Sequence, residues 1–164
     1  MQETGSVADR ILDALAMAAD DAARRQEADY QPNLLLMGLS GPQHVLKTVA
    51  GVRANDLEPA LTTLPFTDAL TILEMVPGWL ADVSKVELSV RVAVLLLKAH
   101  QAKIMASPST RPTLAKLQVS LRNQVQAFKN VMGFNLAGLQ HLSARSRVDA
   151  ATATVPSKRK ATVL

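Results

Sequence analysis

Apolar residues recur along most of the chain at the three- and four-residue spacing of an amphipathic α-helix. On the first segment they are Ile11, Leu12, Leu15, Ala19 and Ala22. This pattern predicts a surface helix from about Val7 to about Glu27 with one buried stripe. Ser6 is expected to be its N-cap, with Asp9 as a weak capping partner.

Proline and glycine divide the next segment into short elements. Pro32 ends the first helix, and the apolar run 34–37 is expected to be an extended or turn-like connector. Three short helices are expected to follow: one from Ser40-Gly41-Pro42 to Gly51, one from an Asn55 and Glu58 capping box through Leu61, and one capped by Thr67 that carries Leu70, Ile72, Leu73 and Val76. Pro77-Gly78 ends or kinks the last of them, so Trp79-Leu80 forms either its final turn or a short connector.

The second half of the chain predicts longer helices. A capping box of Ser84 and Glu87 opens a helix to about Ala106 that is apolar on nearly every side from Val90 to Leu97, which predicts a central core helix. A sixth helix is expected from Thr110-Arg111-Pro112 to Gly133, antiparallel to the fifth. Its apolar set is Leu114, Leu117, Val119, Leu121, Val125, Phe128 and Val131. A short seventh helix, capped at Asn135, carries Phe134, Leu136, Leu139 and Leu142.

The expected fold is therefore all-α: a single helical bundle or short helical-repeat domain of about six to seven helices over residues 1–144. From Arg145 onward the apolar period is lost, so residues 145–164 are expected to form a flexible, disordered basic tail. The apolar fraction of 48% and the aromatic fraction of 3% agree with a helical core built from Leu, Ala and Val.

Composition limits the classes of chemistry. The chain has no cysteine, which excludes disulfides, thiol nucleophiles and cysteine-based zinc sites and favours a reducing compartment. The most apolar run, within 86–99, is shorter than the roughly 20 residues that a membrane span needs, so no membrane contact is expected. The first six residues do not look like a secretory signal.

The residue pattern also argues against catalysis. His44, His100 and His141 lie far apart without metal-ligand spacing, and each is expected to be structural. The glycines form no phosphate-binding loop, and no Gly-x-Ser-x-Gly motif presents a nucleophile. We therefore expect a binding protein rather than an enzyme, with no catalytic residues, no cofactor and no metal.

Charge is divided unevenly along the chain. Residues 1–87 carry 6 Lys/Arg and 13 Asp/Glu, whereas residues 88–164 carry 12 Lys/Arg and a single acid, Asp149. The basic half can attract an acidic protein or nucleic acid, or it can be neutralised by the acidic half when the two pack together. Composition leaves both interpretations open.

Seven basic residues are candidates for RNA contact: Arg91, Lys98, Arg122, Lys129, Lys158, Arg159 and Lys160. The first four form two pairs with a spacing of seven, which places each pair on one helix face, either as a phosphate-binding stripe or as a solvated face. No base-stacking surface accompanies them, because Phe128 and Phe134 occupy apolar positions. The cluster 158–160 is a weak match to a nuclear-import signal or an RNA-contacting tail.

Three stretches carry a family resemblance. They are Asn55-Asp56-Leu57-Glu58-Pro59-Ala60-Leu61 leading to Leu64-Pro65-Phe66, then Val86-Glu87-Leu88 leading to Leu95-Leu96-Leu97-Lys98-Ala99-His100, and finally Val131-Met132-Gly133-Phe134-Asn135-Leu136-Ala137-Gly138-Leu139. Over about residues 42–143 this pattern resembles the carboxy-terminal helical domain of the Utp-twelve type WD-repeat proteins of the UtpB subcomplex. The motif residues are Leu64, Pro65, Phe66, His100, Gly133, Phe134, Asn135, Gly138 and Leu139.

The resemblance implies a scaffold role in the nucleolar small-subunit processome, which matures the small ribosomal RNA. It also implies pairing with the related helical domain of a sister UtpB subunit within a pre-ribosomal RNA-protein assembly. Family members carry two β-propellers before this domain, so we expect a fragment of a longer protein or a separately encoded domain. An RNA-binding helical module that uses the basic half, or a generic helical adaptor, are the alternatives.

Overall fold

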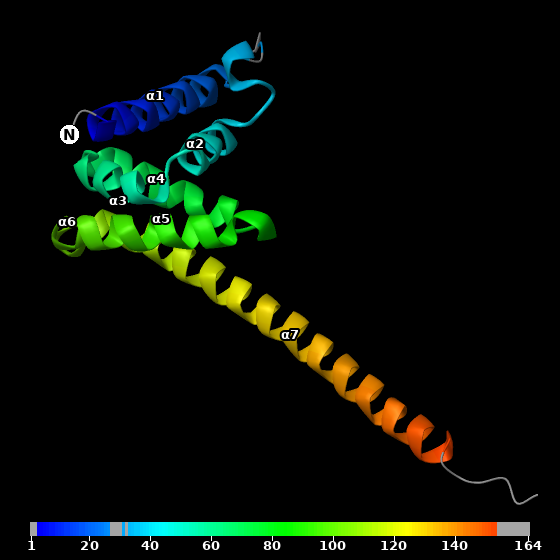
Figure 1. Ribbon diagram of the computed structural model, residues 1–164. Coiled ribbons are helices and arrows are strands. Elements are labelled where there is room, and N and C mark those ends of the chain that lie inside the picture. Colours follow the sequence, from blue (N-terminus) through cyan, green and yellow to red (C-terminus); the bar gives the residue numbers. More distant parts are fainter. Residues whose placement is uncertain (1–2, 27–30, 32, 154–164) are drawn as a thin grey trace, which may run out of the picture. The chain divides into compact units, whose positions relative to one another are not determined.

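The computed structural model describes residues 3–26, 31 and 33–153, with side chains for 7–26, 31 and 33–148 (Figure 1). These residues form seven α-helices, three 3-10 turns and no strand, which confirms the all-α prediction. The elements are α1 Glu3–Arg24, η1 Leu34–Leu36, α2 Gly41–Ala50, α3 Ala54–Thr63, α4 Phe66–Trp79, η2 Val83–Lys85, α5 Val86–Ala99, α6 Gln101–Ala106, η3 Pro108–Thr110 and α7 Arg111–Ala153.

Contacts divide the chain into two units, one that ends at Arg122 and one that begins at Asn123. In the first unit α1 packs on α2 and α3, while α5 packs on α3 and α4 (Figure 1). The largest fully buried side chains come from all of these helices and include Ile11, Val45, Leu57, Leu61, Ile72, Leu73, Leu80, Val92 and Leu96. The prediction that the fifth helix lies centrally is confirmed, although Val94 on its outer face is exposed.

The buried stripe of α1 differs in part from the predicted one. Ile11 and Leu15 are buried as expected, but Ala19 and Ala22 are exposed. The stripe instead advances to Ala18 and then to the carboxylate of Asp21, which is 2% exposed. Burying a carboxylate is costly without a partner, and Asp21 Oδ2 accepts a hydrogen bond from Arg25 Nε at 2.8 Å.

The predicted capping residues of several helices were wrong, although the helices exist. Ser6 lies inside α1, Asn55 lies inside α3, and Thr67 lies inside α4, which begins after Pro65. Ring closure fixes the φ angle of Pro65 without requiring a side-chain cap, so the helix can start one residue earlier than the threonine. Helix α2 starts at Gly41, as the Ser-Gly-Pro sequence predicted, and Ser40 forms a capping box with Gln43 that was not predicted.

Pro77 and Gly78 neither end α4 nor move Trp79 into a connector. Trp79 is the last residue of α4 and is 3% exposed. Its indole Nε1 donates a 2.9 Å hydrogen bond to the Pro42 carbonyl oxygen at the start of α2. Burial of the indole therefore holds the final turn in helical form despite the proline.

The predicted fifth helix is two helices separated at His100. Its expected Ser84 and Glu87 capping box does not form, because Asp82 accepts hydrogen bonds from the Ser84 backbone and hydroxyl and caps the turn η2 instead. These two hydrogen bonds from Ser84 stabilise the ionised carboxylate and lower the pKa of Asp82 from its ordinary value. Helix α5 then starts at Val86, and α6 follows after His100.

The expected stop at Gly133 and the separate short seventh helix were also wrong. Helix α7 is continuous from Arg111 to Ala153, through both Gly133 and the expected cap Asn135. A single glycine costs a helix only about 1 kcal/mol, and no proline follows Gly133 to prevent continuation. The expected basic tail also starts late, since its residues 145–153 are helical and only 154–164 lie outside the described residues.

Only the start of α7 belongs to the core of the first unit. Leu117 is buried, and Leu114 and Leu121 pack against the same core. These three leucines are part of the core of the first unit, and the antiparallel arrangement expected for this helix and the fifth stays a prediction. Four other members of the predicted apolar set are exposed: Val119, Val125, Phe128 and Val131.

Candidate functional site

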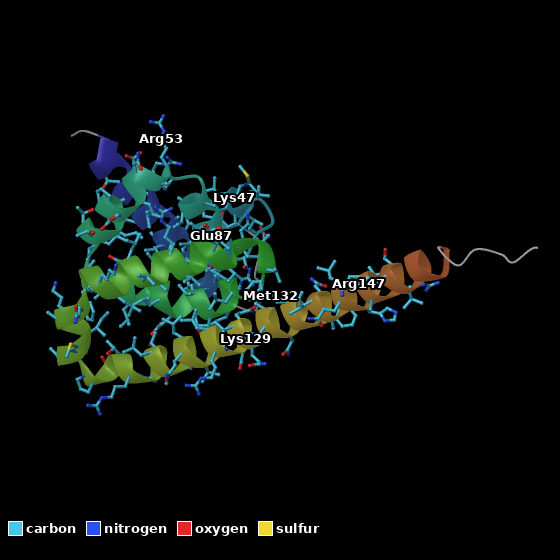
Figure 2. The ribbon with its side chains drawn as sticks, turned by 60° about the horizontal axis from the view of Figure 1, so that its bottom comes forward. Lys47, Arg53, Glu87, Lys129, Met132 and Arg147 are labelled. Atoms are coloured by element: carbon cyan, nitrogen blue, oxygen red, sulfur yellow. The ribbon has the colours of Figure 1, made fainter. Side chains whose placement is uncertain are left out.

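The second unit consists of the continuation of α7, and its apolar side chains are not buried. Exposed fractions are 52% for Val125, 42% for Phe128, 70% for Met132, 65% for Leu139 and 62% for Leu142. An isolated amphipathic helix of this kind gains little stability from its apolar face unless that face is covered. Figure 2 shows Met132 on this part of the ribbon.

These residues follow a heptad-like order. Val125, Phe128, Met132, Leu139 and Leu142 are separated by steps of three, four, seven and three residues, the spacing of a helix seam. We call residues 125, 128, 132, 135, 139 and 142 the α7 seam. Counted along the sequence, Leu114 and Leu121 stand in the same register, at 14 and 7 residues before Phe128.

Asn135 is the one polar member of the α7 seam. It takes the position where the spacing calls for an apolar residue between Met132 and Leu139. In two-stranded helical interfaces a single seam asparagine fixes register at a cost in stability, because its amide must find a partner. Asn135 is one of the family-motif residues, and its position in the α7 seam offers a physical reason for an asparagine there.

The motif residues of the first unit form a local cluster around His100. Leu64 is 3% exposed, Pro65 is the N-cap of α4, and the Phe66 ring lies 6.0 Å from the His100 ring at a tilt of 49°. His100 is buried, and its Nε2 has no hydrogen-bond partner. Phe66 at the start of α4 thus contacts His100 at the end of α5, while Leu64 is buried and Pro65 is exposed.

The other motif residues lie on α7 and do not form one cluster. Phe134 is 80% exposed and stands about 100° around the helix from Asn135, about 120° from Phe128 and about 160° from Met132, so it lies outside the α7 seam. A methyl group added at Gly133 or Gly138 would meet nothing within 4 Å. In the part of the chain that the structure describes, no neighbouring group therefore requires a glycine at either position.

The candidate basic residues are exposed and spread over two helices. Arg91 and Lys98 lie on α5, and Arg91 donates a 3.4 Å hydrogen bond to the Ala54 carbonyl oxygen. Arg122 and Lys129 lie on α7. The cluster Lys158, Arg159 and Lys160 lies outside the described residues, so its role stays a prediction.

Concave features in the first unit are shallow. A polar pocket of about 250 Å³ lies between Glu74 on α4 and Lys116 on α7, where the buried Thr113 hydroxyl donates to Glu74 at 3.2 Å. A more apolar groove of about 400 Å³ is lined by Val94, Leu97, Lys98, Gln101, Ile104, Met105 and Leu114. Ser109 and Pro112 also line the first pocket, and Lys98 is the one charged residue among those that line the second.

One exposed apolar feature, the turn η1, was not expected from the sequence. Leu34 and Leu35 in η1 are 91% and 67% exposed, and Met37 ends the turn with a left-handed φ of 52°. The predicted turn-like connector is confirmed, but its exposure was not foreseen, because a short apolar run gives no periodicity that would assign it to a buried or an exposed face.

Neither a metal-holding cluster nor a helix that could span a membrane is found in the part of the chain that the structure describes. No group of three or more His, Asp or Glu side chains there is arranged to hold a metal ion. Among those same residues, no helix combines the length and the apolarity that a bilayer span needs.

Comparison with known proteins places this architecture in a family. The pattern of the Dip2/Utp12 Family matches residues 41–144, which is more than half of the chain. WD repeat-containing protein 3 homolog of Dictyostelium discoideum is 28% identical over 152 residues. WD repeat-containing protein 3 of Mus musculus and that of Homo sapiens are each 29% identical over 154 residues.

The alignments cover 84% to 85% of this chain but only 16% of each of those three proteins. The chain therefore spans about one sixth of the length of the relatives that it matches. The matched residues 41–144 run from the first residue of α2 to two residues past the end of the α7 seam. The chain belongs to the Dip2/Utp12 family.

Proposed function

We propose that this chain is a non-catalytic scaffold domain that pairs with the related helical domain of a sister UtpB subunit in the nucleolar small-subunit processome. In this role it supports maturation of the small ribosomal RNA by holding subunits together. Membership of the Dip2/Utp12 family supports the ribosome-assembly context.

The observation that carries the proposal is the uncovered α7 seam. Five apolar side chains, each at least two-fifths exposed, follow one face of a helix over 18 residues. Burying such side chains stabilises an interface by roughly 25 cal/mol per Å² of apolar area, before the costs of association. A partner helix laid along the α7 seam is the mode of binding that this geometry supports best.

Light scattering after size exclusion tests the proposal. The full chain, mixed with the helical domain of a sister UtpB subunit, is expected to elute as a complex of defined mass at both low and high salt. Leu139→Asp places a charge in the α7 seam and should abolish the complex. Ala137→Asp, which adds the same charge about 160° around the helix, should leave it intact.

A complex that survives Leu139→Asp would contradict the proposal, provided that circular dichroism shows the helix content of both variants to be unchanged. Failure of the wild-type chain to bind any sister domain would contradict it as well.

A second candidate function is RNA binding, which the basic second half favours. Residues 88–164 carry a single acid against 12 Lys/Arg. Such binding should weaken at least about tenfold between low and physiological salt if several phosphates are contacted. Deleting residues 145–164 separates the candidates, because it should weaken RNA binding and leave docking intact. A generic helical adaptor outside ribosome assembly is the third candidate, and it would bind neither RNA nor a sister subunit.

A further inference from the structure

Between residues 123 and 148 the charges of α7 are of one sign, and Asp149 follows as the single acid of the second unit. From 123 to 148 the ionisable residues are Lys129, His141, Arg145 and Arg147, with no acid among them. Proteins that pair through helix seams use the charges beside the seam to select partners and orientation. The charge on α7 therefore restricts which helices can cover its apolar face.

Lys129 and Arg147 share one side of the helix. They are 18 residues apart, which is about five full turns of an α-helix, so they point in nearly the same direction. That direction is roughly a quarter turn from the mean direction of the α7 seam, so Lys129 lies beside the seam. Arg147 lies five residues beyond Leu142, the last seam residue, on the same side of the helix as Lys129. Both are exposed, and both are labelled on α7 in Figure 2.

A second copy of this chain is a poor occupant of the α7 seam. Pairing two copies would gather lysine and arginine beside lysine and arginine, and like charges that face each other across an interface are repulsive. The long basic side chains can lay their methylene stems against apolar surface while their heads reach a carboxylate. An acidic edge opposite Lys129 and Arg147 satisfies both groups.

We propose that the occupant of the α7 seam is a helix of another chain that carries its own apolar stripe and acidic residues along one edge. This inference rests on the proposed docking function and specifies the chemistry of the partner. It also assigns Lys129 and Arg147 a role in choosing that partner, whereas the seam residues supply the apolar contact.

Two synthetic helical peptides of four heptads test the inference. Both carry leucine at the seam positions, and they differ only in having glutamate or lysine at every position beside the seam. Fluorescence anisotropy with the full chain at low salt should give at least about tenfold tighter binding of the glutamate peptide, and a ratio that shrinks at high salt. Equal binding, preference for the lysine peptide, or binding of neither would overturn the inference.

Charge-reversal variants test whether Lys129 and Arg147 cause the preference for the glutamate peptide. Lys129→Glu and, separately, Arg147→Glu should each weaken binding of the glutamate peptide by at least about threefold and strengthen that of the lysine peptide. The double variant Asn130→Glu/Ala137→Glu changes the net charge by the same amount as Lys129→Glu but lies on the far side of α7, so it should shift both affinities less than about twofold.

Failure of the acidic-partner inference can be told apart from failure of the proposed docking function, because the two are tested by different experiments. If the sister domain binds the wild-type chain and not Leu139→Asp, while the two peptides bind equally, the docking function stands and only the acidic partner is rejected. If the glutamate peptide is preferred but no sister domain binds, the docking surface is retained and its assignment to the processome fails.

Discussion

The indole Nε1 of Trp79 donates a hydrogen bond of 2.9 Å to the carbonyl oxygen of Pro42, across 37 residues of sequence. The contact joins the last residue of α4 to the first turn of α2, and the indole itself is 3% exposed. A buried indole N–H without a partner would be costly, so the side chain and its acceptor position each other.

Trp79→Phe should lower the free energy of unfolding of the first unit by about 1 to 3 kcal/mol, since it removes the hydrogen bond and part of the buried ring. Urea denaturation followed by circular dichroism measures the change, because the chain has no second tryptophan for fluorescence. A variant as stable as the wild type would show that the Pro42 contact contributes nothing.

Gly41 marks the closest approach of α2 to α1. A Cβ atom there would stand 2.9 Å from both the Cα and the Cβ of Ala18, and backbone must shift to admit it. Gly41→Ala should therefore destabilise the first unit by about 1 to 3 kcal/mol. Gly78→Ala is the matched control: it lies inside α4 with nothing within 4 Å, so it should stabilise by a few tenths to 1 kcal/mol. Equal effects of the two substitutions would contradict this packing.

Gly133 lies inside α7 with open space around it. Gly133→Ala should raise the helix content of the chain and stabilise α7 by about 0.5 to 1 kcal/mol, because alanine loses less backbone entropy than glycine in a helix. Far-ultraviolet circular dichroism measures the change. A fall in helicity would indicate that the helix ends at Gly133, as the sequence pattern alone predicted.

Asp82 gives the chain a specific pH dependence. The Ser84 hydroxyl and backbone N–H hydrogen bonds lower the pKa of this carboxyl in the folded state, from an ordinary value of 3.8. Its stabilising contribution is therefore complete well above 3.8 and is lost as the pH falls through the lowered folded-state pKa. Carbon-detected NMR titration should give Asp82 a pKa below 3.8 in the wild type and one closer to 3.8 in Ser84→Ala. Identical values would remove Ser84 as the cause.

Most of the helices could be predicted from the sequence because apolar periodicity and the positions of proline and glycine are local signals. Helix α2 begins and ends as its Ser-Gly-Pro start and Gly51 indicate. The caps of α3 and α4 were misplaced by two residues each, because several residues near a helix start can serve as the cap and tertiary packing selects among them. At Trp79, burial of a side chain overrode the helix-breaking preference of Pro77.

The candidate site was predictable in part. The apolar residues of the α7 seam, except Met132, were placed on predicted apolar helix faces, but these faces were divided between two helices at Gly133. Periodicity shows which residues share a face and does not show whether the same chain covers it. Leu117 and Phe128 have similar local patterns, yet one is 2% and the other 42% exposed.

The central claim is that a partner helix covers the α7 seam. Amide hydrogen exchange, measured on the chain alone and in complex with a sister UtpB helical domain, tests it most directly, since burial of a helix face slows exchange along that helix. The account predicts slowed exchange over residues 125–142 in the wild-type complex and no slowing for Leu139→Asp mixed with the same domain. Protection confined to residues before Arg122, with residues 125–142 unchanged, would contradict it.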